Sequence, residues 1–448
     1  SQRLVEDSMT PQKNYWKARS KDMVGITKMK AEKQKAEKEA FFCTTKELSR
    51  LGLEQIPTQF QSHKHLIYSS PATLAFNSPG AEGFGVKRAG LAVPDSIMLI
   101  VAPGCCGRNT SLISSMKEYN DRFYYLMMDE TDIVTGRHLK KIPKAVEEIC
   151  SVCPKKPSVV MICITCVDAL LGTDMERVCK KAEEQVEIPV RPCYMYALTR
   201  EGRKPPMVHV RQSLYSLLEP GKKKGNVVNL LGFFSPLVDD CEIYDLLHSA
   251  GVKTIHEISR CKDYMEYQTM SEANFNLVLH HEARFAAEDF HNRLQIPFIE
   301  LRRLYQIDKI ENQYHALGNA LGVAFYDEKY KKQAEDALEK FRQRCPDASF
   351  AIGECLNADP FELSLALIRY GFSVPEIYGT ITVENFTYIR SLAKISPETK
   401  VFSNMEPTMI YYDPAKSDVN LAIGKDACYY HPDCPYVMWN GEEQPYGY

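Results

Sequence analysis

Short apolar segments alternate with amphipathic segments from residue 96 onward. In the first part of this region, the apolar runs predict three buried strands, at Ser96–Ala102, Ser158–Thr165 and Glu187–Arg191. Helical spacing follows each of the first two, with predicted helices from near Asn109 or Thr110, at Lys140–Val152 and at Val167–Gln185. Strands that alternate with helices form parallel sheets covered on both faces, so we expect a doubly wound α/β unit here.

The alternation restarts twice along the chain. After a linker-like stretch at 221–225, the pattern predicts strands at Asn226–Leu231, Val252–Glu257, Phe275–Leu279 and Ile296–Leu301, and helices at Cys241–Ala250 and Arg284–Leu294. After a helix at Asp327–Cys345, it predicts strands at Ser349–Gly353, Ser373–Tyr378 and Lys400–Ser403, and helices from Asp359 to Tyr370 and at Glu384–Ile395. At the start of the Asp359 helix we expect an N-cap aspartate, a proline at the first helical position and a capping-box carboxylate from Glu362.

These three repeats predict three Rossmann-like, doubly wound parallel-sheet domains around a central cleft. We place the domains at residues 86–220, 221–325 and 326–448, the last with an irregular tail rich in aromatic residues. Residues 1–85 are expected to form an N-terminal arm that carries the first candidate metal-binding cysteine. The beginning of this arm is rich in Lys and Glu, which favours an exposed helix.

Composition excludes several classes of function. The chain has 448 residues, of which 44% are hydrophobic and 25% charged, with a net charge of −3, so we expect a cytoplasmic protein that binds neither nucleic acid nor membrane. No P-loop motif and no nucleophile elbow are present. Gly83-Phe-Gly85 does not continue as a dinucleotide-binding fingerprint.

Fifteen cysteines, read as cytosolic thiols, favour metal or redox chemistry over disulfides. Cys43, Cys106 and Cys166 lie at long, nearly equal intervals, which is unlike the closely spaced ligand pairs of zinc ribbons. Cys106 and Cys166, like Cys193, follow predicted strands of the first unit, and the carboxyl ends of parallel strands lie at one edge of a sheet. Thiolates gathered there by the fold would suit an iron–sulfur cluster, although the Gly-Cys-Cys-Gly turn could also be merely a tight turn.

The motifs around these cysteines resemble those of nitrogenase component 1, the molybdenum–iron-protein type of oxidoreductase. The similar segments are Cys43, Pro103-Gly-Cys-Cys-Gly107, the segment 129–142, Cys166 with Gly172 and Asp174, Ile188-Pro-Val-Arg191, Gly424-Lys-Asp-Ala427 and Pro445-Tyr-Gly-Tyr448. Their order and spacing extend the resemblance over most of residues 43–448.

The resemblance implies a dimer or an α₂β₂ assembly with an iron–sulfur cluster at a subunit interface, of the [4Fe–4S] or P-cluster type. Cys43, Cys106 and Cys166 would be its ligands in this chain. It also implies a separate ATP-hydrolysing iron protein as electron donor, which agrees with the missing P-loop.

The sequence departs from the family where the nitrogenase catalytic subunit holds its active-site cofactor. His280 stands where that family has a cysteine after a strand of the middle domain, and His281 follows it. The segment 437–443 contains no histidine, although His431 and Cys434 lie upstream. We expect His280 or His281 to bind a second metal cluster in the cleft, or His280 to donate a proton during reduction, because imidazole does both near neutral pH. The competing interpretation is a structural His-His pair.

Three functions remain open at this point. The first is a reductase subunit that accepts low-potential electrons from the iron protein and reduces a small molecule or a bound cofactor near His280. The second is a scaffold of the same family that assembles or carries a cluster. The third is the non-catalytic partner subunit of a heteromeric reductase.

Overall fold

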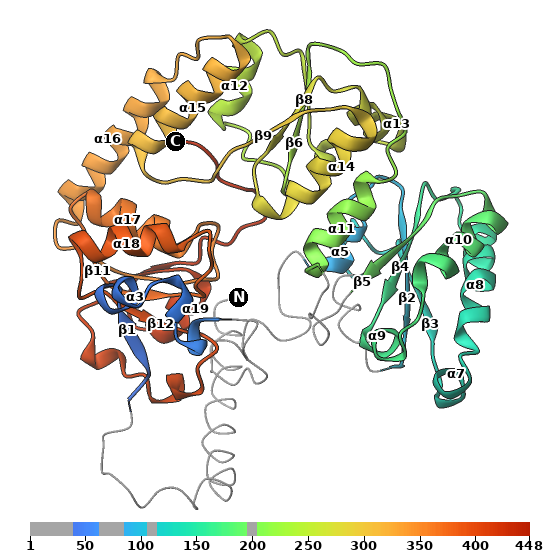
Figure 1. Ribbon diagram of the computed structural model, residues 1–448, viewed down its shortest axis with the longest axis horizontal. Coiled ribbons are helices and arrows are strands. Elements are labelled where there is room, and N and C mark those ends of the chain that lie inside the picture. The colour runs from blue at the N-terminus through green and yellow to red at the C-terminus, as the bar shows by residue number, and fades with distance from the viewer. Residues whose placement is uncertain (1–38, 62–84, 105–113, 195–203) are drawn as a thin grey trace, which may run out of the picture.

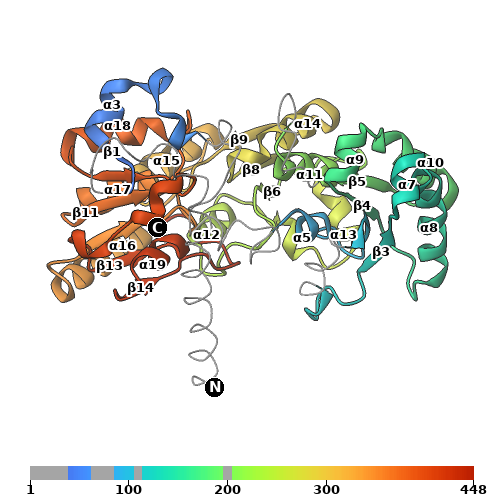
Figure 2. The same ribbon diagram turned by 90° about the horizontal axis from the view of Figure 1, so that it is seen from below.

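The computed structural model describes residues 39–61, 85–104, 114–194 and 204–448, and three sheets organise these residues. Figures 1 and 2 show the sheets following one another along an arc, and we call them and their helices the first, second and third units. The first and second sheets are entirely parallel, and the third is parallel except for one strand. The predicted α/β class with mainly parallel sheets is confirmed; the predicted helical arm at 1–38 lies outside the described residues.

The first unit has the strand order β3-β2-β4-β5. Its strands are β2 (Ile97–Ala102), β3 (Phe123–Met127), β4 (Val160–Ile164) and β5 (Val190–Tyr194). Its helices are α5 (Val86–Gly90), α7 (Glu130–Thr135), α8 (His138–Val152), α9 (Cys166–Leu171), α10 (Met175–Val186) and α11 (Pro206–Tyr215). The single helix predicted at 167–185 is in fact two, because Gly172 adopts φ +65° and Asp174 caps the second helix.

The second unit has the order β7-β6-β8-β9. It contains β6 (Val227–Leu231), β7 (Thr254–His256), β8 (Phe275–Val278) and β9 (Phe298–Glu300), with helices α12 (Glu242–Ser249), α13 (Tyr264–Gln268), α14 (Arg284–Leu294) and α15 (Ile307–Leu321). Helix α11 packs between the first and second units. Its Val210 and Leu214 belong to one apolar core that also contains Met161 of the first sheet and Val278 of the second.

The third unit has the order β1-β12-β11-β10-β13-β14. Its parallel strands are β10 (Ser349–Ile352), β11 (Ser373–Tyr378), β12 (Lys400–Phe402), β13 (Leu421–Ile423) and β14 (Tyr436–Val437). Its helices are α16 (Glu328–Arg344), α17 (Pro360–Arg369), α18 (Phe386–Ile395) and α19 (Lys425–Tyr430). The remaining strand, β1 (Phe42–Thr44), pairs antiparallel with β12 and leads into α3 (Thr45–Leu51), so the segment around Cys43 belongs to this sheet.

The start of α17 shows how a long-range contact replaces a local one. Asp359 caps the helix as expected, accepting from the backbone nitrogens of Phe361 at 2.9 Å and Glu362 at 3.0 Å, and Pro360 takes the first position. The predicted capping box does not form. The Glu362 carboxylate instead accepts a hydrogen bond from the backbone nitrogen of Tyr305 at 2.9 Å. Tyr305 lies between β9 and α15, so this bond pairs a backbone donor of that connection.

Candidate functional site: three strand-end crevices

The order of the strands reverses once in each sheet, between β2 and β4, between β6 and β8, and between β10 and β13. Open α/β sheets bind ligands in the crevice outside the carboxyl ends of the strands at this position. The first strand of each pair is followed by a glycine: Gly104, Gly232 and Gly353 in the first, second and third units. The second strand is followed, in the same order, by Cys166, His280 and Gly424. The candidate ligands Cys166 and His280 therefore occupy corresponding places in two successive units.

Cys166 stands at the first crevice. Strands β2 and β4 run in register from Ile97–Val160 to Val101–Ile164, so Gly104 and Cys166 leave the sheet at neighbouring positions. Cys166 is the first residue of α9. Cys105 and Cys106 follow Gly104 directly but lie outside the described residues, so the ligand role of Cys106 stays a prediction.

A buried polar pair ties the helix that begins with Cys166 to α8. His138 Nε2 lies 2.8 Å from Asp168 Oδ1, and neither side chain is exposed to solvent. His138 Nδ1 lies 3.1 Å from the carbonyl oxygen of Asp132. Each ring nitrogen of His138 therefore lies within hydrogen-bonding distance of an oxygen inside the protein.

Cys43 lies far from this crevice. It sits in β1 at the edge of the third sheet, buried in an apolar core with Leu48, Ile56 and Phe60, whereas α9 lies at the other end of the arc (Figures 1 and 2). Burial, followed by the charge of Glu47, raises the pKa of the Cys43 thiol to about 11. The described residues thus do not bring Cys43 and Cys166 together, and this separation argues against Cys43 as a ligand of the same cluster.

Cys193 also has a structural position. It was expected to follow a strand, but it lies inside β5, opposite Cys163 of β4 in the register. Its buried sulfur donates to the carbonyl oxygen of Val86. The expectation that Cys193 joins the crevice is wrong, because the buried strand continues to Tyr194.

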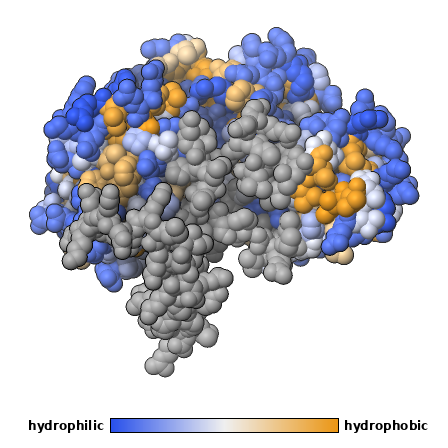
Figure 3. Space-filling view, turned by 60° about the horizontal axis from the view of Figure 1, so that its bottom comes forward, coloured by the Kyte–Doolittle hydropathy of each residue, from blue (hydrophilic) through white to orange (hydrophobic). Residues whose placement is uncertain are grey.

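Exposed apolar side chains surround the crevice of the first unit. Met127 at the end of β3 is 62% exposed, Val134 of α7 is 84% exposed and Leu171 of α9 is 45% exposed. Figure 3, in which the bottom of Figure 1 comes forward, shows hydrophobic surface on this unit at the right. Apolar surface of this kind is typical of protein–protein interfaces.

His280 lies at the second crevice, in a cavity of about 540 Å³ between the second and third units. Its ring stacks on His281, with 4.5 Å between centroids, and meets the edge of Phe233 at 5.7 Å. Its Nδ1 accepts from the backbone nitrogen of Glu282 at 3.3 Å. Burial, and then the charges of Arg211, His281 and Arg303, hold the pKa of His280 well below its ordinary value. The imidazole is therefore neutral at neutral pH, and a metal bound at Nδ1 would replace the hydrogen bond from Glu282.

Arg211 of α11 fixes the two loops that form the crevice. Its Nε and Nη2 donate to the carbonyl oxygen of Gly232 at 2.9 and 2.6 Å, and its Nη1 donates to Glu282 at 2.8 Å. Gly232 adopts φ +139°, and a Cβ there would lie 2.7 Å from the backbone nitrogen of His280. A glycine is thus required for β6 and β8 to end this close together.

The third unit supplies the opposite wall of the cavity. Glu354 accepts from the backbone nitrogen of Thr380 at 2.8 Å, and burial raises the pKa of Glu354. Asp426 of α19 accepts from the backbone nitrogens of Glu354 and Cys355, at 2.8 and 2.9 Å. The loop after β10 is therefore held by hydrogen bonds on both sides, which makes this wall rigid.

Sequence reasoning missed the guanidinium groups of the cavity. Arg303 follows β9 and donates from Nη2 to Gln444 at 2.6 Å, while its planar group lies 4.5 Å from the centre of the Phe233 ring. The sequence contained a signal for Arg303, since two consecutive arginines directly follow the predicted strand Ile296–Leu301. Arg211 had no such signal, because the segment at 206–215 was not predicted as a helix.

Potential metal ligands are sparse in the described residues. No group of three or more His, Cys, Asp and Glu side chains there has the arrangement of a metal site. His431 lies inside the third unit, with Nε2 3.1 Å from Glu376, and it does not line the His280 cavity. Within the same residues, no helix is both long enough and apolar enough to span a membrane.

Comparison with known proteins decides the family. Residues 82–430 match the family model described as nitrogenase component 1 type oxidoreductase. The chain belongs to this family. The family assignment made from the motifs is thereby confirmed.

Named relatives and solved structures agree with this assignment. The chain is 25% identical over 382 residues to a nitrogenase iron-molybdenum cofactor biosynthesis protein NifE of Sinorhizobium fredii, covering 80% of this chain and 75% of that protein. It is 24% identical over 256 residues to NifE of Clostridium pasteurianum, covering 55% and 54% of the two chains. A structure of nitrogenase Cp1 at pH 6.5 superposes with a TM-score of 0.64 at 17% identity, covering 86% of this chain and 87% of that chain, which shows the shared fold.

Proposed function

We propose that this chain is a subunit of a scaffold that assembles or carries a metal–sulfur cluster for another protein. An iron–sulfur cluster would be held at the first crevice by Cys106 and Cys166, and the cargo cluster would sit in the cavity beside His280. Both NifE relatives described above are named as cofactor biosynthesis proteins, which supports a scaffold over a reductase.

The observation that carries the proposal is the ligand set of the His280 cavity. Among the described residues that line it there are two imidazoles, His280 and His281, and five carboxylates, but no cysteine. A cluster held without thiolates can be released to an acceptor more readily than one held by several thiolates. This is what a carrier needs and what a permanent active site does not.

One guanidinium of the cavity, that of Arg303, is suited to contact an anionic group of the cargo, although the lining also contains several carboxylates. Arg211 is paired with Glu282, and Arg284 is paired with Glu300 at 2.8 Å. Arg303 instead bonds the neutral amide of Gln444, so its charge is not neutralised by that partner. A guanidinium in a partly dehydrated cavity attracts an anion more strongly than the same group in bulk water.

The exposed apolar surface around Cys166 supports a partner subunit. We infer that Met127, Val134 and Leu171 contact a sister or identical subunit, and that the cluster at the first crevice lies at this interface. Ligands missing from this chain would then come from the partner.

Anaerobic purification with the products of neighbouring genes tests the proposal, with iron and sulfide counted and transfer to an acceptor that lacks its cluster measured. We expect Cys166→Ala to lose the first cluster and His280→Ala to lose only the cargo. Cys43→Ala is the matched control and should keep both. Full iron content in Cys166→Ala would contradict the ligand assignment. ATP-dependent reduction of a substrate with an added iron protein, without cluster transfer, would favour the reductase subunit instead.

A further inference from the structure

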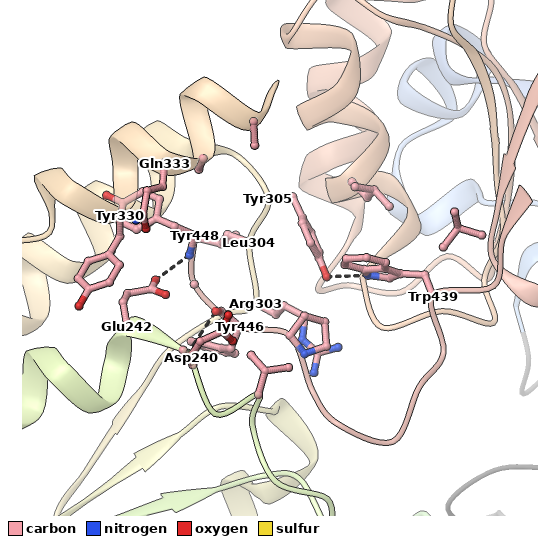
Figure 4. A pocket seen from close by; sticks show the side chains of 18 of the residues that line it. Asp240, Glu242, Arg303, Leu304, Tyr305, Tyr330, Gln333, Trp439, Tyr446 and Tyr448 are labelled. Carbon is pink, nitrogen blue, oxygen red and sulfur yellow. Dashed lines mark hydrogen bonds between the residues drawn. The ribbon is translucent and has the colours of Figure 1, made fainter. Parts of the chain in front are cut away.

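A second cavity, of about 620 Å³, lies beside the His280 cavity and is separate from the proposed cluster chemistry. The loop before α12, the segment after β9, helix α16 and the chain after β14 enclose it. Figure 4 shows Glu242, Tyr330 and Tyr448 on one side of this cavity and Tyr305 with Trp439 on the other. Arg303 is shared by the linings of both cavities.

The tyrosine hydroxyls that line this second cavity have already donated their protons elsewhere. The acceptors are the carbonyl oxygen of Asn357 for Tyr305 at 2.7 Å, Asp245 for Tyr330, the carbonyl oxygen of Arg302 for Tyr446 at 3.1 Å, and Asp327 for Tyr448 at 2.6 Å. The indole nitrogen of Trp439 donates to the Tyr305 oxygen at 3.1 Å. A tyrosine has a single proton to donate, so these side chains offer a ligand only oxygen lone pairs and aromatic faces.

Carboxylates reinforce this acceptor character at one end. Asp240 and Glu242 line the cavity directly, and Glu242 is fixed there by the Tyr314 hydroxyl at 2.7 Å and the backbone nitrogen of Tyr448 at 2.6 Å. The hydrogen bond to Asp245 raises the pKa of Tyr330 to about 12, so this phenol stays protonated and its ring becomes richer in electrons. This ring already has a cation beside it, since Lys329 Nζ lies 5.1 Å from its centre, which leaves the carboxylates as the groups open to a ligand cation.

Arg303 is the one cation among the described lining residues. Its planar group lies over Phe233, and its Nη2 donates to Gln444; both of these partners line the His280 cavity. The two carboxylates of the second cavity, Asp240 and Glu242, therefore face a single lining cation whose contacts lie toward the neighbouring cavity.

The remaining walls are apolar. Leu363, Ile423 and Val437 line the cavity from the third unit, and Ala334 and Ala337 line it from α16. None of the 17 residues of α16 is buried, although Leu338 and Phe341 pack partly against the core of the third unit. A ligand with an apolar body would cover this surface, and burial of apolar area contributes about 25 cal/mol per Å².

We propose that this cavity binds a small organic amine with one protonated nitrogen and an apolar or aromatic body. The ammonium group would lie against Asp240 and Glu242, donating hydrogen bonds to their carboxylate oxygens. The body would lie between Trp439 and the alanines of α16. The cavity volume lies within the range of small-molecule sites.

Fluorescence titration measures the binding of an amine in this cavity directly, because Trp439, one of the two tryptophans of the chain, lines it. In a Trp16→Phe background, Trp439 is the only tryptophan left. The probes are 2-phenylethylammonium, the matched neutral 2-phenylethanol and the anionic 3-phenylpropionate, with calorimetry as a second readout. We expect the amine to bind about tenfold more tightly than the alcohol, and the carboxylate to bind weakest.

Two variants locate the binding site. Asp240→Asn, in an exposed loop, should weaken amine binding and leave alcohol binding unchanged. Ala337→Leu should weaken both by filling the cavity, with Lys332→Leu on an exposed position of the same helix as its control, and a thermal melt reports whether each variant is folded. Equal binding of amine and alcohol, stronger binding of the carboxylate, or no binding of any probe would each overturn the proposal. The proposal would also be overturned if amine binding were the same in Asp240→Asn, in Ala337→Leu and in the unsubstituted protein.

Discussion

Gly232 and His280 follow neighbouring parallel strands so closely that a Cβ on Gly232 would lie 2.7 Å from the His280 backbone nitrogen and 2.9 Å from its Cβ. Gly353 shows the same tightness in the third unit, where a Cβ would lie 2.1 Å from Asp426 Oδ1. In both units the crevice at the strand ends is therefore shaped by a glycine that a larger residue could replace only with movement of the backbone at His280 or of the Asp426 carboxylate.

Gly232→Ala should destabilise the protein more than backbone strain alone requires. A non-glycine residue in such a conformation costs about 1–3 kcal/mol, and the clash with His280 adds to it. Gly251→Ala is the matched control, because Gly251 has φ +90° and nothing within 4 Å of the added Cβ. The free energy of unfolding of both variants is measured by urea denaturation and compared with that of the wild type. Equal losses of stability in the two variants would show that the contact with His280 has no energetic effect.

Separating His138 from Asp168 should be strongly destabilising. Removing one partner of a buried pair leaves the other unpaired, which costs about 3–5 kcal/mol. A double-mutant cycle with His138→Gln and Asp168→Asn should give a large coupling energy by chemical denaturation. The exposed Lys155–Asp95 pair, at 2.7 Å, is the control: Lys155→Met should cost less than about 1 kcal/mol. Coupling as small as that of the exposed pair would contradict the buried arrangement.

Glu362 makes stability fall as the pH rises. Burial raises the pKa of its carboxyl group from 4.5 to about 7, so the folded protein holds this proton more tightly than the unfolded chain does. The contribution of this proton to the free energy of unfolding is fully present below pH 4.5 and is lost as the pH rises to about 7. It amounts to about 3 kcal/mol at most. In Glu362→Gln this part of the pH dependence should disappear from denaturation curves measured between pH 4.5 and 8. If the free energy of unfolding of the variant changed with pH as steeply as that of the wild type, Glu362 would not be the group responsible.

His280 should remain neutral on mild acidification. Its pKa is depressed in the folded protein, so its contribution to stability is present above the ordinary value of 6.5 and is lost as the pH falls below it. The ring resonances of His280, assigned by comparison with His280→Gln, should not titrate between pH 8 and pH 6 by nuclear magnetic resonance. Titration near 6.5 would mean that the imidazole is hydrated and outside the influence of Arg211 and Arg303.

The pattern of the chain was enough to predict most of the repeated elements. The helix at Arg284–Leu294 and the strand at Ser373–Tyr378 have the predicted bounds, and the other predicted strands of the second and third units differ by a few residues at most. The position of His280 at the end of a strand followed from the same pattern. Such features depend on the alternation of apolar and polar residues within about ten positions, which is a local property of the sequence.

Tertiary structure alone decided which distant segments meet. The sheet that contains Cys43 is set by pairing of β1 with β12, whose residues are far apart in the chain, and no periodicity encodes that choice. The tail was predicted to be irregular, yet Tyr446 is buried in the core of the second unit and Gln444 pairs with Leu237. The sequence by itself thus determined the three α/β units and the strand-end place of His280. The partners of Cys43, the guanidinium groups around His280 and the second cavity were decided by packing between segments that are remote in the chain, where burial of surface outweighs local preference.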